Sequence, residues 1–202
     1  MTDHPRSRFI QRLRKVAAPR VFGRDINGVS AVEFALIVPL MITLLFAGVE
    51  LSQAITIYRK TSHTGSALGD LVAQVGSVTA AEMTDVMNAA QAIMSPYNPN
   101  GVQMVVSRVD VDNNGAARVM WSVGKNTGKW ACGAPPITIP AGMLVKNTSM
   151  VVSDVKYVYV STFQSIMQDI FGSTSITLKD TAYLKPRVTD KITYGGGMCP
   201  GA

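Results

Sequence analysis

The feature that most constrains this chain is an uncharged apolar run of sixteen residues, Phe34–Val49, with the sequence FALIVPLMITLLFAGV. A bilayer span needs about 20 residues. Extending the run to Val29–Ile57 supplies that length, but it brings in two carboxylates, Glu33 and Glu50. These lie 17 positions apart, or about 26 Å along a helix. Each therefore falls near one boundary of the hydrocarbon, and the sequence predicts a single transmembrane helix.

Basic residues are concentrated ahead of this run. Residues 1–28 contain seven basic and two acidic residues, a balance of +5, whereas residues 29–202 contain 12 basic and 11 acidic residues, a balance of +1. A basic arm can bind nucleic acid, but one that ends at a long apolar run is typical of a segment that sets membrane orientation. We therefore expect no nucleic-acid partner, a cytoplasmic amino terminus and a carboxyl-terminal domain outside the membrane.

A secretory signal peptide has a similar basic start and apolar core. Here, however, no clear small-x-small cleavage site follows the core before Glu50, and the helical pattern continues through Tyr58. We therefore expect the apolar segment to be retained.

The junction between the basic arm and the apolar run reads NGVSAVEF over residues 27–34. A glycine ends the arm, an apolar helix begins, and one carboxylate stands five residues after the glycine. This junction resembles the processing site of type IV pilin-like proteins, in which a membrane-embedded aspartic peptidase cuts after the glycine. The sequence AVEFALIVP resembles the TadE-type pseudopilins of the Tad (Flp) tight-adherence pilus system. That resemblance covers about residues 22–60, and the segment 183–194 is loosely similar to the carboxyl-terminal end of such proteins.

The resemblance implies roles for four residues. Cleavage between Gly28 and Val29 would leave Val29 as a new, positively charged amino terminus, and Glu33 is then expected to neutralise the amino terminus of a neighbouring subunit. Phe34 completes the motif. A glycine suits a peptidase that binds an extended backbone, and a carboxylate inside a membrane is costly enough to indicate function. The alternative is that Glu33 reaches water at the interface and has no role.

The resemblance also implies a function. The chain is expected to be a minor pilin or pseudopilin of a Tad adhesive pilus, anchored in the bacterial inner membrane with its carboxyl-terminal domain in the periplasm. Its expected partners are that membrane, the prepilin peptidase, and other pilins and pseudopilins of the Tad machinery. The long leader and the large domain after the helix favour a minor, initiating or anchoring subunit. The alternatives are an unprocessed single-pass anchor whose outer domain binds a partner or the cell wall, and an anchored hydrolase.

The sequence after the helix predicts a small outer domain, so that the whole chain has a pilin-like α+β fold with one helix and a mainly antiparallel sheet. The helix is expected at 80–95, with Thr79 as its cap, Pro96 as its stop and a methionine stripe facing the core. Strands are expected at 102–111, 116–123, 150–160 and 175–184, with a short helical or loop stretch near 163–171.

These features divide the chain into four parts. They are a cytoplasmic basic leader (1–28), a transmembrane helix (29–58), a helix extension or linker (59–78) and an extracytoplasmic α+β domain (79–202). Cys132 and Cys199 are the only cysteines, and an oxidising compartment makes a disulfide between them the expected state. The alternative is two independent thiols.

Motifs for catalysis or metal binding are weak. Asp110–Gly115 begins like a calcium loop, but the twelfth position is Trp121, where a carboxylate is needed. A hairpin turn is the better interpretation because Asn-Gly favours a primed turn. Only two histidines exist, His4 in the leader and His63 in the extended helix, so neither can complete a triad in the outer domain. We therefore expect no enzyme activity, no metal site and no cofactor.

Overall fold

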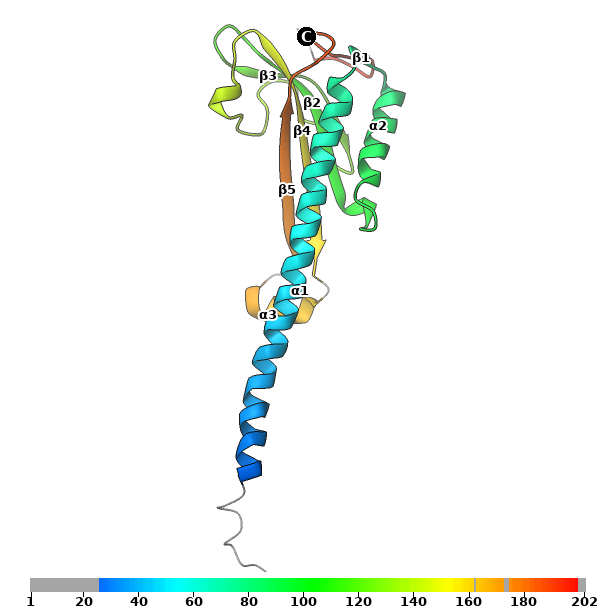
Figure 1. Ribbon diagram of the computed structural model, residues 1–202. Helices are drawn as coiled ribbons and strands as arrows, with labels where there is room; N and C mark the ends of the chain where they lie inside the picture. Colours follow the sequence, from blue (N-terminus) through cyan, green and yellow to red (C-terminus); the bar gives the residue numbers. More distant parts are fainter. Residues whose placement is uncertain (1–25, 162, 173–174, 200–202) are drawn as a thin grey trace, which may run out of the picture. The chain divides into compact units, whose positions relative to one another are not determined.

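The computed structural model describes residues 26–161, 163–172 and 175–199 (Figure 1). It contains three α-helices, six strands and two single-turn 3₁₀ helices within those residues. In chain order these are α1 (Ile26–Ala73), β1 (Ser77–Val78), α2 (Ala80–Ala92), η2 (Pro99–Gly101), β2 (Val102–Val111), β3 (Ala117–Lys125), η3 (Ala141–Met143), β4 (Thr148–Val160), α3 (Gln164–Phe171), β5 (Ser175–Leu184) and β6 (Thr193–Tyr194). The predicted α+β class is confirmed.

The chain forms two compact units, residues 1–48 and residues 49–202. The described part of the first unit is the beginning of α1. The most apolar stretch of 18 residues in this helix contains no buried residue. By length and composition this helix can cross a membrane. Pro39 lies inside the helix, and the Thr43 hydroxyl donates a hydrogen bond of 2.8 Å to the Pro39 carbonyl.

The second unit is built on a four-stranded antiparallel sheet with the order β3-β2-β4-β5. The predicted hairpin between β2 and β3 is confirmed, but the prediction of a primed turn is wrong. Val111 pairs with Ala117, and the Gly115 amide bonds to the Asp112 carbonyl, so Asn113 and Asn114 are the central residues of the turn, and neither has the positive φ that a primed turn requires. Its turn is held by Asp112, whose Oδ1 accepts hydrogen bonds of 2.8 Å from the amides of Asn114 and Ala116. Gly115 has a φ of +85°, a conformation that glycine adopts without strain. The sequence did not predict β1 and β6, which pair in parallel over two residues each.

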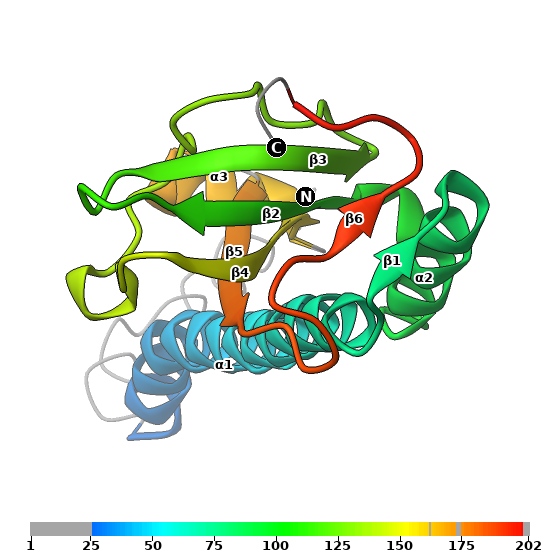
Figure 2. The ribbon, with the colours of Figure 1, turned by 90° about the horizontal axis from the view of Figure 1, so that it is seen from above.

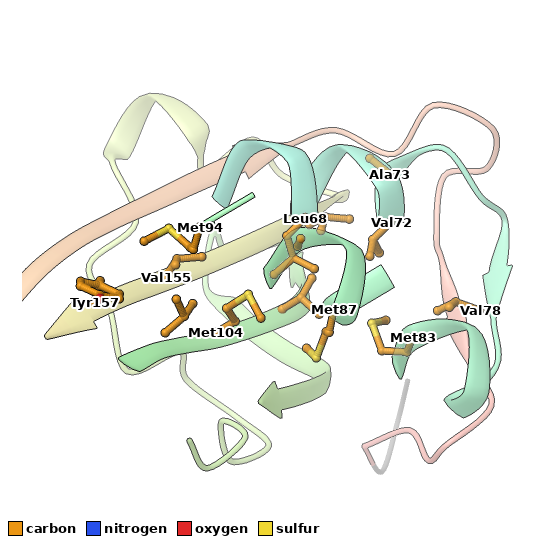
Figure 3. Close-up of a cluster of buried hydrophobic side chains, with 14 of the residues drawn as sticks. Leu68, Val72, Ala73, Val78, Met83, Met87, Met94, Met104, Val155 and Tyr157 are labelled. Atoms are coloured by element: carbon orange, nitrogen blue, oxygen red, sulfur yellow. The ribbon is translucent and has the colours of Figure 1, made fainter. Parts of the chain in front are cut away.

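One face of the sheet is covered by α2 and by the part of α1 that belongs to the second unit (Figure 2). Thr79 caps α2 as predicted, through a capping box with Glu82. The methionine stripe of α2 is buried in the core, again as predicted, and Figure 3 shows these side chains against the sheet. The fully or almost fully buried residues of this cluster include Leu68, Val72, Met83, Met87, Met94, Met104, Trp121 and Val155.

Two glycines of α1 allow the helix to approach the sheet closely. The carbonyl of Gly65 accepts a hydrogen bond of 2.8 Å from the Ser153 hydroxyl. A Cβ atom at Gly69 would overlap a methyl group of Leu184. Because the two glycines are four residues apart, they lie on the same face of the helix. Small residues at this spacing therefore set the distance between α1 and the strands β4 and β5.

The opposite face of the sheet is partly covered by the segment 126–147 between β3 and β4. Ile139 from this segment is buried against Val109, Val119 and Val152 of the sheet. Cys132, in the same segment, forms a disulfide with Cys199. The Cys199 amide also donates to the Met120 carbonyl, at 2.7 Å. The disulfide thus attaches the carboxyl-terminal tail to the edge of the sheet formed by β3.

Candidate functional site

The predicted cleavage junction lies in the first turn of α1, which begins at Ile26. A Cβ atom at Gly28 would meet no atom within 4 Å among the described residues. A glycine inside a helix costs about 1 kcal/mol relative to alanine. Packing within the described part of the chain therefore does not explain this glycine.

The residues predicted to act in assembly follow within two turns of the same helix. Val29 and Phe34 are 59% and 70% exposed, and Glu33 is exposed as well. Glu33 lies four positions after Val29, so the two share one face of the helix. The structure thus presents a carboxylate one turn from the predicted new amino terminus. Within the described residues, no side chain or amide bonds to the Glu33 carboxylate.

The second carboxylate of the apolar segment, Glu50, has a different environment. It is only 8% exposed. Its Oε2 atom accepts a hydrogen bond of 2.6 Å from the Tyr159 hydroxyl, and its Oε1 atom accepts one of 3.2 Å from the Phe163 amide. Sequence reasoning missed these partners because they lie more than 100 residues along the chain. The only local signal was a carboxylate at the end of an apolar run, which needs a partner when it is buried.

Removing one of these donors is expected to destabilise the second unit. In Tyr159→Phe the buried Glu50 carboxylate loses the 2.6 Å hydrogen bond from the tyrosine hydroxyl, and a hydrogen bond to a charged group contributes about 1.5–3 kcal/mol. The measurement is the urea midpoint of the full chain in detergent micelles. Tyr58→Phe is the matched control, because Tyr58 is 46% exposed on the same helix. Equal midpoints for the two variants would contradict the role of the Tyr159 hydroxyl.

Residues 183–194, which loosely resemble the carboxyl-terminal end of TadE-type proteins, connect the end of α1 to the sheet. The Arg187 guanidinium pairs with Asp70 of α1, and the Arg187 amide donates to the Ala73 carbonyl at 2.9 Å. Further along, the Ile192 carbonyl accepts hydrogen bonds from the Trp121 indole (2.8 Å) and from Arg108 (3.3 Å). The segment is therefore part of the structural frame of the second unit.

Charge around this segment is balanced. Burial by itself raises the pKa of the Asp110 carboxyl. Hydrogen bonds from Arg108 and the charges of Arg108 and Lys191 lower this pKa by more, so it lies below the usual value. Asp110 accepts from the Arg108 Nε atom at 2.8 Å, and the Lys191 ammonium lies 3.6 Å away. This carboxylate therefore neutralises the buried Arg108.

No group of three or more histidine, cysteine, aspartate or glutamate side chains that could hold a metal is found in residues 26–161, 163–172 and 175–199. His63 is exposed on α1, and His4 lies outside the described residues. Asp112 holds the hairpin turn, and the buried Asp154 accepts from Thr181 at 2.8 Å. These carboxylates have structural partners, and the expectation of a non-enzymatic protein stays a prediction.

Together, fold and junction define a class: an α+β domain joined to a long apolar amino-terminal helix that begins with a glycine–glutamate motif. The model of the family described as TadE-like protein matches residues 28–64. The resemblance predicted from the junction is thereby confirmed, and this segment of the chain is TadE-like. No curated protein and no solved structure matches the chain.

Proposed function

We propose that this chain is a minor pilin or pseudopilin that takes part in the assembly of a Tad (Flp) adhesive pilus after a prepilin peptidase cuts between Gly28 and Val29. The observation that carries the proposal is the TadE-like match, which begins at Gly28 and includes Glu33 and Phe34. Family membership of this kind associates a protein with the Tad pilus machinery and the membrane. The exposed glycine without a packing role supports cleavage at that position.

Cleavage would change the helix in two ways. It would remove the seven basic residues of the leader, which otherwise hold the amino terminus on the cytoplasmic side. It would also place a new ammonium group on Val29. In a medium of low dielectric, an isolated charge is strongly disfavoured, and a nearby opposite charge is correspondingly favoured. Glu33 of a neighbouring subunit supplies that charge when two helices pack side by side.

The orientation of the subunit in the membrane and its kind of role in the pilus follow from the same features. The basic leader favours a cytoplasmic amino terminus, so the second unit lies on the periplasmic side of the inner membrane before assembly. The apolar surface of α1, which is exposed from Val29 to Leu45, is the contact for lipid first and for other pilin helices afterwards. A domain of this size after the helix favours a minor, initiating or anchoring subunit over the main shaft protein.

The mature amino terminus tests the proposal directly. We expect intact-mass and amino-terminal peptide measurements on the protein extracted from its native membrane to show Val29 as the first residue. A chain that retains residues 1–28 would contradict cleavage. It would favour the second candidate, an unprocessed single-pass anchor whose periplasmic domain binds a partner or the cell wall.

A further inference from the structure

The strand β3 forms one edge of the four-stranded sheet. The outward backbone groups of an edge strand can pair with a strand of another chain, and proteins commonly prevent this by placing charges along the edge. The other edge strand, β5, has Lys179 and Asp180 in its middle. In β3, residues 119–124 are all uncharged, and charges stand only near the ends, at Arg118 and Lys125. The edge formed by β3 therefore needs another form of protection.

The outer side of β3 is occupied at two adjacent residues. The Val119 amide donates a hydrogen bond of 2.7 Å to the Gly133 carbonyl, and the Met120 carbonyl accepts one of 2.7 Å from the Cys199 amide. Met120 is an extra residue in β3, because the residues on either side of it pair with two consecutive residues of β2. A bulge of this kind leaves the extra residue without a partner in the ladder, so its carbonyl is available to the tail.

The two segments that make these contacts are the same two segments that the disulfide joins. Gly133 directly follows Cys132, and Cys132 is bonded to Cys199 across 67 positions of the chain. Figure 2 shows the tail passing from β6 to the outer side of β3. The disulfide therefore lies where both segments meet the edge of the sheet.

Between β6 and Cys199, the tail makes one other hydrogen bond within the described residues. The Gly195 amide donates it to the Val78 carbonyl, at 2.9 Å. Residues 195–197 are three consecutive glycines, and glycine loses more conformational freedom on ordering than any other residue. The single hydrogen bond at Cys199 contributes less free energy than the ordering of these residues costs. The disulfide therefore supplies the constraint that keeps the tail on β3.

We propose that the Cys132–Cys199 disulfide is a redox-controlled closure of the β3 edge, which keeps this edge from pairing with the β3 edge of a second copy of the chain. Formation of the bond oxidises two thiols, and the disulfide of an oxidising protein accepts their two electrons and two protons and becomes a dithiol. In the reduced chain the tail leaves β3, and the Met120 carbonyl faces water.

A second copy is the partner because two identical edges can pair about a two-fold axis. The middle of β3 carries no charge that would oppose its own image, whereas two β5 edges would bring like charges together at Lys179 or Asp180. The inference goes beyond a role in a pilus. It requires neither cleavage at Gly28 nor assembly.

Amide hydrogen exchange, resolved by NMR, tests the closure on the full chain in detergent micelles. The oxidised chain is compared with the double variant Cys132→Ser, Cys199→Ser, which has no thiols that could cross-link two copies. We expect the amide of residue 199 to exchange in the double variant as fast as in an unstructured peptide, because a fraying terminus opens at almost no free-energy cost. The Gly195 amide, bonded to Val78 in the same tail, is the matched control and is expected to keep its protection.

Light scattering of the same samples tests the consequence for association. We expect the double variant to self-associate at concentrations where the oxidised chain stays monomeric. Adding Met120→Lys to the double variant places a charge on the opened edge and is expected to restore the monomer. Met143→Lys is the matched control, because it adds the same charge at a methionine that is 41% exposed outside β3. It is expected to leave the association unchanged.

Four results would overturn the proposal. Equal protection of residue 199 in both chains would mean that the tail stays on β3 without the disulfide. An equal loss of protection at Gly195 would mean that the disulfide holds the whole tail rather than the β3 edge. Equal association of the two chains, or a rescue by Met143→Lys, would mean that an open β3 edge is not the surface that pairs. None of these measurements concerns the mature amino terminus, so a failure here is distinguishable from a failure of the proposed function.

Discussion

Replacing Gly28 by valine is expected to leave residues 1–28 on the protein. The variant places a branched side chain directly before the predicted scissile bond, where a peptidase binds the backbone closely. One extra methylene in such a pocket costs about 1–3 kcal/mol, or roughly a 10- to 200-fold loss of rate, and valine adds three carbon atoms, so we expect at least this loss. The folded chain tolerates the change, because a Cβ atom at Gly28 meets no described atom within 4 Å. The measurement is the fraction of mature protein in the native membrane, from intact mass.

Gly48→Val is the matched control for this experiment. Gly48 also lies in α1, and a Cβ atom there likewise meets nothing within 4 Å. The two variants therefore change the same helix by the same atoms, and only the distance from the junction differs. We expect Gly48→Val to be cut as completely as the unchanged chain. Normal cutting of Gly28→Val would contradict the assigned junction, and retention of residues 1–28 in both variants would point to a general effect on the helix.

Replacing Glu33 by glutamine is expected to abolish most surface piliation. Glutamine keeps the size of the side chain and removes its charge, so the neighbour's Val29 ammonium group loses its partner. A hydrogen bond to a charged group contributes about 1.5–3 kcal/mol, which corresponds to roughly a 10- to 100-fold loss of association. The measurement is the amount of pilus protein sheared from the cell surface, relative to the amount of this subunit in the membrane.

Two controls separate assembly from processing and folding. Asp85→Asn removes a carboxylate from the exposed surface of α2 and is expected to leave piliation unchanged. The mature terminus of Glu33→Gln is measured in the same samples, so that a loss of pili is attributed to assembly only when cleavage is normal. Normal piliation of Glu33→Gln would remove the role that we assign to this side chain.

Several elements were predictable because their causes are local. Thr79 and Glu82 form a capping box within four residues, and the methionines of α2 recur at helical spacing, so the start and the buried face of this helix follow from the sequence. The β2–β3 hairpin follows from β-rich runs on either side of the turn-forming residues 112–115, Asp-Asn-Asn-Gly. The prediction of the end of α2 was less exact, because the helix stops at Ala92, three residues before the predicted end.

Only part of the candidate site was predictable from the sequence. Gly28, Val29 and Glu33 are neighbours in sequence, so their spacing on the helix follows from the sequence alone. The partners of Glu50 were not predictable, because Tyr159 and Phe163 come from the far end of β4 and the segment after it. The pairing of β1 with β6 joins residues more than 110 positions apart over only two residues, and such short strands have no recognisable pattern.

The sequence by itself determined the apolar helix, the glycine–glutamate junction and the α+β class, because hydrophobic periodicity, turn chemistry and charge act over a few residues. Only the tertiary structure decided the strand order β3-β2-β4-β5, the close approach of Gly69 to Leu184 and the burial of Glu50. These features depend on contacts between distant segments. Such contacts form only when burial of the whole core offsets the entropy of bringing those segments together.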